Sequence, residues 1–190
     1  MSYISGKSSG QFTITHNYAY GTETMNYVIL NGDSDKIKRG SCTLDSGTST
    51  VVNDSNVASA SKIFLQTTDQ NGFFKFARVV SKSNGSFEIT HQSASGNETF
   101  DYIVFNADGD DDIYLGSDTL DAYPITNTTV IDDNAETGST ILLQSTSAQT
   151  WLGSPAYAYW RINGKSNGHF TITSNAIDLG ATFDYVILNT

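Results

Sequence analysis

The stretch SKSNGSFEITH at residues 81–91 has two further versions in this chain of 190 residues, GKSSGQFTITH at 6–16 and GKSNGHFTITS at 164–174. Each version is followed by a second match, ETMNYVILN at 23–31, ETFDYIVFN at 98–106 and ATFDYVILN at 182–190. The phenylalanines Phe12, Phe87 and Phe170 anchor the alignment and lie 75 and 83 residues apart. Self-similarity at this spacing predicts a structural unit of roughly 70 to 80 residues that is used more than once.

A further matching segment precedes only the second and third copies. It aligns SCTLD at 41–45 with SDTLD at 117–121, VVND at 51–54 with VIDD at 130–133, KIFLQT at 62–67 with TILLQS at 140–145, and FKFARV at 74–79 with YAYWRI at 157–162. The first copy begins at the equivalent of Arg78 and therefore has only its second half. We expect two complete units, at 41–106 and 117–190, and an N-terminal half unit at 1–31, a β-hairpin that completes another unit or subunit.

The local pattern predicts β-strands throughout. Phe-x-Ile-Thr has a period of two, which places Phe87 and Ile89 on one face of a strand. The later stretch 100–105 becomes apolar on both faces, as expected of a strand that is buried on both sides. Asn84-Gly85 and Asn167-Gly168 indicate hairpin turns, because both residue types tolerate a positive φ. The sequence thus predicts an all-β fold of tandem small β-sandwich or barrel units, two complete units plus the half unit.

Composition excludes several classes of function. The chain has 10 Lys and Arg against 20 Asp and Glu, a formal net charge of −10, whereas a protein that coats DNA or RNA needs clustered cationic side chains. No leader peptide and no apolar run of membrane-spanning length is visible, so we expect synthesis in a cytoplasm without membrane insertion. The single cysteine, Cys42, excludes an intramolecular disulfide and a zinc cluster built on cysteines.

Two motifs resemble catalytic or metal-binding patterns. Residues 6–10 and 164–168 match the G-x-S-x-G pattern of hydrolases, but a predicted strand follows each match where a nucleophile elbow needs a helix. We therefore expect hairpin turns there. The acidic run at 106–112 is rich in possible oxygen ligands for Ca²⁺, but its spacing does not fit an EF-hand loop. A solvated linker between units is the favoured interpretation, and a bound cation is the alternative.

Recurrence also argues against catalysis by histidines or carboxylates. His16 and His91 occupy matching positions, but the third copy has Ser174 there, so a capping or turn role is expected. The pair Glu98 and Asp101 recurs only in part, which gives little support to a glycosidase dyad. We predict no catalytic residue, no bound metal and no cofactor.

Two groups of apolar and aromatic side chains are candidate contact surfaces. A half unit exposes an apolar face and open strand edges, so that face is the expected assembly interface. Its side chains are Phe12, Ile14, Tyr27, Val28, Ile29 and Leu30. Trp151, Tyr157 and Tyr159 can stack on a sugar and are possible glycan contacts, with a place in the core or at an interface as the alternative.

Residues 51–68 and 79–106, VVNDSNVASASKIFLQTT and VVSKSNGSFEITHQSASGNETFDYIVFN, resemble a short β-domain that is common in structural proteins of tailed bacteriophages. In that family a TTVV.D..V...S.I.L.PT stretch precedes V.AKS.GSFT.TH......RTF.Y.I. The resemblance covers 41–106 well, 117–190 moderately and 6–31 for the second half only. It implies a binding or oligomerising unit, found at the ends of fibre-like and other virion proteins, and it carries over no catalytic residue.

The resemblance and the half unit together predict a non-enzymatic structural protein of a bacteriophage virion, a capsid decoration or cement protein. We expect it to be made in the host cytoplasm, to form a homo-oligomer, and to contact the major capsid protein or other virion proteins but not nucleic acid. The alternative is a receptor-binding tail-fibre or adhesin module that recognises a host surface glycan. A small polysaccharide-acting hydrolase is a third alternative with weak support.

Overall fold

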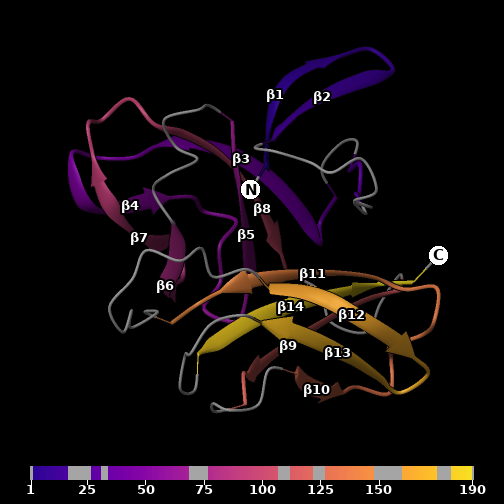
Figure 1. Cartoon of the computed structure of the whole chain (residues 1–190). Coiled ribbons are helices and arrows are strands. Elements are labelled where there is room, and N and C mark those ends of the chain that lie inside the picture. The colour runs from indigo at the N-terminus through magenta and orange to yellow at the C-terminus, as the bar shows by residue number, and fades with distance from the viewer. Residues whose placement is uncertain are drawn as a thin grey trace. The chain divides into compact units, whose positions relative to one another are not determined.

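The computed structural model describes residues 2–16, 27–30, 34–68, 77–106, 112–121, 127–147, 160–174 and 181–189 (Figure 1). Within these ranges all regular secondary structure is β-strand, which confirms the predicted all-β fold. The strands are β1 (Ser2–Ser8), β2 (Gln11–His16), β3 (Ile37–Thr43), β4 (Gly47–Asn53), β5 (Lys62–Thr67), β6 (Arg78–Ser83), β7 (Ser86–Ala94), β8 (Thr99–Phe105), β9 (Ile113–Thr119), β10 (Asn127–Ile131), β11 (Thr140–Ser145), β12 (Trp160–Ser166), β13 (His169–Ser174) and β14 (Thr182–Leu188). The described residues accordingly include no helix with the length and hydropathy of a membrane span.

The chain divides into two compact bodies, Met1–Asn106 and Ala107–Thr190, and each contains two three-stranded antiparallel sheets. In the first body β8 lies between β3 and β5, and β7 lies between β4 and β6. In the second body β14 lies between β9 and β11, and β13 lies between β10 and β12. The strand order is the same in both, and we name residues 37–105 module A and residues 113–188 module B. In each module the first three strands form the first half and the last three form the second half.

Within each module the two sheets bury one face each, and these two buried faces form a single core. In β7 every second residue from Phe87 to His91 is buried. The core of module A contains Leu44, Val52, Val57 and Ile63 from the first half and Phe87, Ile89, Phe100, Tyr102 and Val104 from the second half. The core of module B combines Leu120, Val130 and Ala135 with Phe170, Ile172, Phe183, Tyr185 and Ile187. Because both halves supply core side chains, each half buries the apolar face of the other.

The hairpin between β6 and β7 has a β-bulge, and the same irregularity occurs in the other two copies of the motif. The pairing shifts by one residue between Val79 and Ser81, between Ile162 and Gly164, and between Ile4 and Gly6. A bulge at one fixed position increases the local twist and fixes the register of the pair. The three hairpins therefore have a common backbone design.

The turns at the tips of these hairpins differ in one respect from the predicted pattern. Gly10, Gly85 and Gly168 take positive φ values of 78°, 87° and 84°, which is the conformation that glycine adopts without a steric penalty. Asn84 and Asn167, which precede two of these glycines, do not have a positive φ. In the described part of the chain Asp112 is the one non-glycine residue with a positive φ. Only the second turn position needs the left-handed conformation here, so either serine or asparagine serves at the first.

An aspartate clasp joins the two halves of each module. In module A the Tyr102 hydroxyl donates to Oδ2 of Asp54 at 2.9 Å, and the Asn56 amide donates to Oδ1 of the same carboxylate at 2.9 Å. In module B Tyr185 donates to Oδ2 of Asp132 at 2.8 Å. Tyrosine comes from the second half and aspartate from the first half, so the bond closes the module across its core.

The glycine of the hairpin tip completes the clasp through its backbone. The Gly85 amide donates to the Val57 carbonyl at 2.8 Å, and the Asp54 amide donates to the Gly85 carbonyl at 2.9 Å. In module B Gly168 makes the matching bonds to Ala135, at 2.9 Å, and with Asp132, at 3.0 Å. The recurring Lys-Ser-Ser/Asn-Gly stretch therefore serves to dock the second half on the first.

The clasp corrects one part of the predicted repeat. Asp54 matches Asp132, so the alignment of VVND at 51–54 with VIDD at 130–133 is wrong by one residue. Burial shows the physical reason, because Val52 and Val130 point into the cores and are 8% and 1% exposed. Val51 and Ile131 point outward and are 58% and 78% exposed, and letter similarity does not distinguish the two faces of a strand.

The Asp54 carboxyl of the clasp makes the stability of module A depend on pH. Burial raises the pKa of the Asp54 carboxyl, but hydrogen bonds from Asn56 and Tyr102 outweigh it and lower the pKa below its usual value. A carboxyl whose pKa is lowered by folding stabilises the native state above its unfolded pKa, about 3.9 for aspartate. That contribution is lost as the pH falls through the lower folded pKa.

We predict that Asp54→Asn lowers the stability of module A at pH 7 by about 1 kcal/mol or less, because the partly solvated carboxylate is screened by water, and that it reduces the loss of stability in acid. Asparagine still accepts the bond from Tyr102 but carries no charge. Denaturant titrations between pH 7 and pH 2, followed by hydrogen exchange of the β7 and β8 amides with correction for the intrinsic exchange rate at each pH, report on module A alone. Asp45→Asn, at an exposed carboxyl, is the matched control. An unchanged acid profile in Asp54→Asn would contradict the prediction.

Candidate assembly surface

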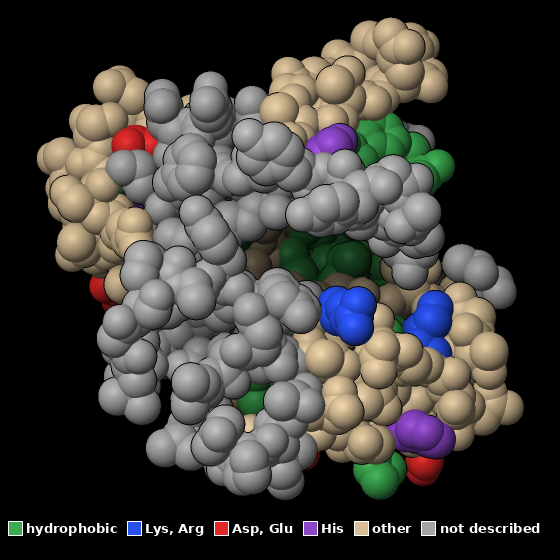
Figure 2. Space-filling model, in the orientation of Figure 1, with side chains coloured by type: hydrophobic (Ala, Val, Ile, Leu, Met, Phe, Trp, Pro, Cys, Tyr) green, Lys and Arg blue, Asp and Glu red, His purple; other side chains and the backbone are tan. Residues whose placement is uncertain are grey.

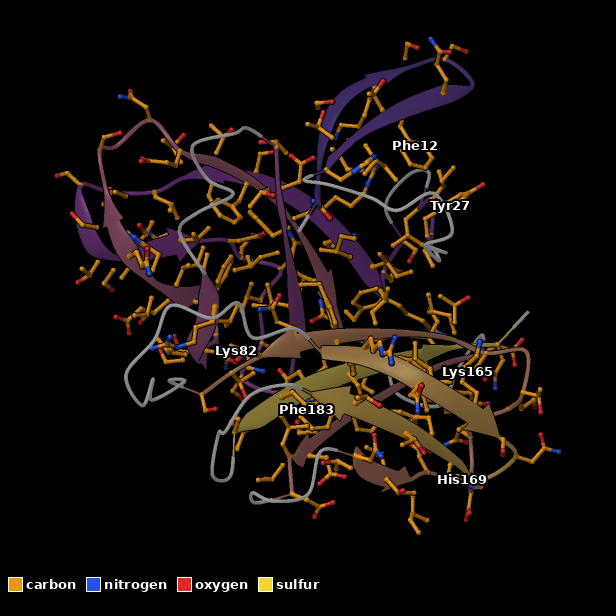
Figure 3. All side chains as sticks on the ribbon, viewed as in Figure 1. Phe12, Tyr27, Lys82, Lys165, His169 and Phe183 are labelled. Atoms are coloured by element: carbon orange, nitrogen blue, oxygen red, sulfur yellow. The ribbon has the colours of Figure 1, made fainter. Side chains whose placement is uncertain are left out.

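The N-terminal residues are arranged like the second half of a module. The hairpin β1–β2 matches β6–β7 and β12–β13 in its bulge and in its turn. The Phe12 and Tyr27 rings pack edge to face, with centroids 5.1 Å apart and planes at 69° (Figure 3). The matching pairs, Phe87 with Tyr102 and Phe170 with Tyr185, have centroid distances of 5.1 and 5.2 Å and interplanar angles of 70° and 73°. The half unit thus has the central aromatic pair of a module in place.

The environment of this pair differs sharply from that in the modules. Tyr27 is 64% exposed, whereas Tyr102 and Tyr185 are each 6% exposed. Ile29 is exposed as well, and Phe12, Ile14, Val28 and Leu30 are half-buried. Hydrophobic side chains lie at the surface beside the β1–β2 hairpin (Figure 2). Four of the six residues expected at the assembly interface match residues that the modules bury in their cores, and we call these four the open face: Phe12, Ile14, Tyr27 and Ile29. Val28 and Leu30 alternate with them along the chain, and the use of any of the six in assembly stays a prediction.

Within the described residues the strands of the half unit have fewer neighbours than their counterparts in the modules. In the described part of the chain β2 pairs with β1 alone, whereas β7 and β13 are central strands with a partner on each side. Residues 27–30 match the central strands β8 and β14 but form no strand themselves. An apolar face beside an unpaired strand edge is a template for pairing with a further strand.

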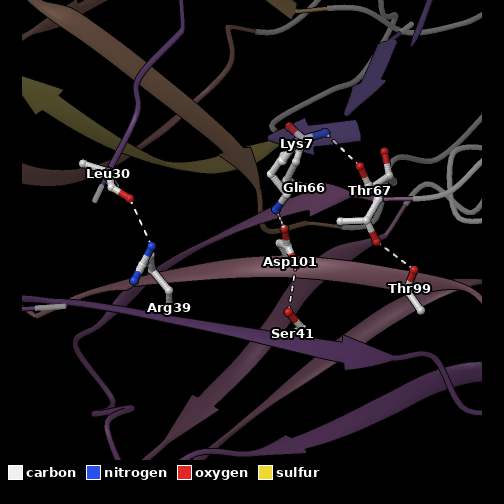
Figure 4. Close-up of polar contacts among 9 residues, drawn as sticks. Lys7, Leu30, Arg39, Ser41, Gln66, Thr67, Thr99 and Asp101 are labelled. Atoms are coloured by element: carbon white, nitrogen blue, oxygen red, sulfur yellow. Dashed lines mark hydrogen bonds and ion pairs between the residues drawn. The ribbon is translucent and has the colours of Figure 1, made fainter. Parts of the chain in front are cut away.

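Polar contacts hold the half unit to module A (Figure 4). The Lys7 ammonium pairs with Oδ2 of Asp101 at 2.5 Å, and Ser41 donates to Oδ1 of Asp101 at 2.8 Å. The Arg39 guanidinium donates to the Leu30 carbonyl at 3.2 Å. The Lys7 side chain is 65% exposed, so its ion pair contributes little stability, of order 0–1 kcal/mol. None of these contacts uses the rings of Phe12 and Tyr27.

The candidate catalytic groups are not brought together in the described part of the chain. Ser8 and Ser166 end the strands β1 and β12, and a hairpin turn and another strand follow each of them. His91 is buried and is hydrogen bonded to Thr50 and to the Gln92 carbonyl, both at 2.9 Å. His16 is exposed at the end of β2. These serines and histidines therefore have the surroundings of turn and core residues.

The two carboxylates of the candidate glycosidase dyad have separate structural roles. Glu98 is buried and accepts bonds from the amides of Ser95, Gly96 and Asn97 at 2.9–3.2 Å, which organises the turn before β8. Asp101 binds Lys7 and Ser41 instead. The loop role of Glu98 has no counterpart in the third copy, which has Ala181 at that position.

Metal and thiol chemistry receive no support from the described residues. They include no group of three or more His, Cys, Asp and Glu side chains that can hold a metal ion. Most of the acidic run, 107–111, lies outside the described residues, and so do the possible glycan contacts Trp151, Tyr157 and Tyr159. Burial, and then the charge of Asp101, raises the pKa of the Cys42 thiol to about 11, so the thiol is protonated near neutral pH.

Comparison with known proteins bears on module A. Residues 36–105 match the family model described as K1 capsule-specific polysaccharide lyase, C-terminal domain. This range coincides with β3 to β8 to within one residue at the N-terminal end. Module A is a phage-associated β-domain. No curated protein and no solved structure matches the chain. The family model that matches module A is that of the C-terminal domain of the lyase. Module B lies outside the matched residues.

Proposed function

We propose that the protein is a non-enzymatic structural component of a bacteriophage virion, and that it decorates or cements the capsid by assembling through β-sandwich contacts. The observation that carries the proposal is the open face, an apolar surface that both modules of the same chain bury. The proposed organisation is a half unit at 1–31 and two units at 41–106 and 117–190. The phage-associated match of module A supports the virion as its location.

The proposed partners are further copies of the chain and the major capsid protein or another virion protein. A net charge of −10 and a low content of charged residues, 16%, suit repeated packing on the outside of a particle without binding to packaged DNA. The described candidate catalytic groups serve turns and cores, which supports a structural rather than an enzymatic role.

The family match favours a second candidate, a receptor-binding tail-fibre or adhesin module. The matched family takes its name from a lyase specific for the K1 capsule polysaccharide, so its C-terminal domain belongs to proteins that meet polysaccharide. In this alternative the module contacts a host surface glycan. The proposed decoration role and this alternative require very different numbers of copies in a particle.

Quantitative mass spectrometry of purified virions tests the proposal. A decoration protein is expected in hundreds of copies, in a simple ratio to the major capsid protein, whereas a fibre protein is present in single or low double digits. Binding on a glycan array, together with a low copy number, would support the tail-fibre alternative. Absence of the protein from purified particles would contradict both candidates.

A further inference from the structure

Two Asn-Gly pairs lie at the tips of the module hairpins, Asn84-Gly85 between β6 and β7 and Asn167-Gly168 between β12 and β13. Both asparagines are exposed. Asparagine reacts most readily with the chain when glycine follows it, because glycine has no side chain to shield its amide nitrogen from the neighbouring carboxamide. The half unit has Ser9 at the matching position, and serine has no carboxamide. Of the three hairpin tips, those of the two modules therefore contain a group that can react.

The reaction open to such a pair is deamidation. The glycine nitrogen gives up its proton and attacks Cγ of the asparagine, so that a new C–N bond forms and the side-chain nitrogen leaves as ammonia with that proton. One water molecule then opens the resulting succinimide ring at either carbonyl, and the product is aspartate or isoaspartate. No oxidant or reductant takes part. Either product adds one negative charge to the tip.

Docking of the tip on the first half holds the attacking nitrogen. The Gly85 amide donates to the Val57 carbonyl at 2.8 Å, and the Gly168 amide donates to the Ala135 carbonyl at 2.9 Å. An amide whose proton is held in this way does not exchange its hydrogen until the bond opens, and the same opening is needed before the nitrogen can attack. The reaction therefore requires the tip to separate from the loop that follows β4 or β10.

The asparagine side chain adds a bond to the first half in module A. Oδ1 of Asn84 accepts a hydrogen bond from the Ser59 amide at 3.2 Å. Within the ranges that the structure describes, the side chain of Asn167 makes no hydrogen bond. The carboxamide therefore helps to hold the tip closed in module A and does not do so in module B.

We propose that Asn84 and Asn167 are deamidation sites that closure of the modules protects, so that each is converted only while its hairpin tip is separated from the first half. This inference does not depend on the proposed role in the virion. Asn167 is converted faster than Asn84, because its side chain does not hold the tip closed. The clasp adds to the protection, since it binds the same loop to Tyr102 in module A and to Tyr185 in module B.

The isoaspartate product prevents the module from closing again. Its main chain runs through Cβ and Cγ, so the tip is one carbon longer than before. Gly85 then no longer lines up with both the Val57 carbonyl and the Asp54 amide, to which it is bonded in the closed module. A reversible opening becomes an irreversible loss of docking, and the lifetime of a module depends on how often its tip opens.

Peptide mapping by mass spectrometry of the full-length protein, aged in mildly alkaline buffer, tests the proposal. Synthetic peptides of residues 81–91 and 164–174 are the unprotected references. We expect Asn84 to react at least about 100-fold more slowly in the protein than in its peptide, and Asn167 at least about tenfold more slowly. A rate in the protein equal to that in the peptide, at either site, would overturn the proposal.

Two features of the mapping assign the products to the hairpin tips. Ageing in heavy-oxygen water marks the products that form before digestion, and only marked products enter the rates. Trypsin cleaves after lysine, so a cut at Lys165 separates Asn167 from the further Asn-Gly pair at 163–164.

Hydrogen exchange of the two glycine amides measures the same opening independently. The factor by which folding slows exchange of the Gly85 amide is expected to equal, within about threefold, the factor by which it slows deamidation of Asn84. The same agreement is expected for Gly168 and Asn167. Deamidation that outpaces exchange beyond this margin would mean that the reaction does not pass through the open tip, and it would overturn the proposal.

Variants of the clasp separate the two modules. Tyr102→Phe removes a bond to the loop of module A and is expected to speed deamidation of Asn84 about threefold or more, with Asn167 unchanged within about twofold. Tyr185→Phe is expected to do the reverse. Asn84→Ser copies Ser9 of the half unit and is the matched control, expected to give no product at residue 84. No acceleration in either tyrosine variant, or acceleration at both sites, would overturn the proposal.

Discussion

Phe170→Ala is expected to destabilise module B by about 3–5 kcal/mol, whereas Phe12→Ala, at the same position of the repeat, is expected to cost less than about 1 kcal/mol. Phe170 is fully buried in the core of module B and contacts Tyr185, so its removal leaves a cavity that the surrounding strands cannot fill. Phe12 is half-buried and packs against an exposed tyrosine. Its truncation removes little area from a closed core.

Hydrogen exchange with mass spectrometry measures both effects in one molecule, because peptides from β2, β7 and β13 report on separate copies of the motif. Phe87→Ala is the control in module A and is expected to match Phe170→Ala, since Phe87 is 2% exposed. Equal losses of stability from Phe12→Ala and Phe170→Ala would show that the open face is closed in the free protein. That result would remove the observation on which the assembly proposal rests.

Much of the fold follows from local sequence pattern, because burial along a strand alternates and leaves a period of two in the sequence. Phe87 and Ile89 are buried on one face, and Val104 and Phe105 are both buried, as the two-sided apolar pattern of β8 predicts. Gly85 and Gly168 mark the hairpin turns. The sequence also predicts that Tyr27 and Ile29 belong to an apolar surface; both side chains are exposed, and their use in assembly stays a prediction.

The clasp could not be predicted by matching letters, because VVND and VIDD align best one residue out of register. The missed pattern is Asp-x-Asn, which places Asp54 with Asn56 and Asp132 with Asn134 in the same turn. The bond to tyrosine joins residues 48 positions apart in module A and 53 in module B. A contact between residues so far apart in the sequence depends on how the two sheets pack. The alternation of apolar and polar residues along a single strand does not predict it.

A glycine faces each clasp tyrosine across the sheet. Gly40 in β3 pairs with Tyr102 in β8, and Gly116 in β9 pairs with Tyr185 in β14. A methyl group at Gly40 would lie 2.1 Å from Cζ of Tyr102, and one at Gly116 would lie 2.0 Å from Cζ of Tyr185. The tyrosine ring therefore lies over the space that any larger residue would fill, and this position lets its hydroxyl reach the aspartate.

We predict that Gly40→Ala destabilises module A, and Gly116→Ala module B, by about 2–5 kcal/mol each. The new methyl group displaces the tyrosine ring, which adds the cost of overpacking to the loss of a hydrogen bond to a charged carboxylate. Denaturant titration followed by hydrogen exchange of β8 and β14 assigns each loss to its module. Gly138→Ala is the matched control, because nothing lies within 4 Å of its added methyl group, and a change of less than about 1 kcal/mol is expected.

The double variant Gly40→Ala with Tyr102→Leu tests the mechanism. Leucine does not extend over residue 40, so the alanine is expected to add less than about 0.5 kcal/mol to the cost of Tyr102→Leu alone. Additive losses would mean that Gly40 is required for the strand backbone rather than for the ring.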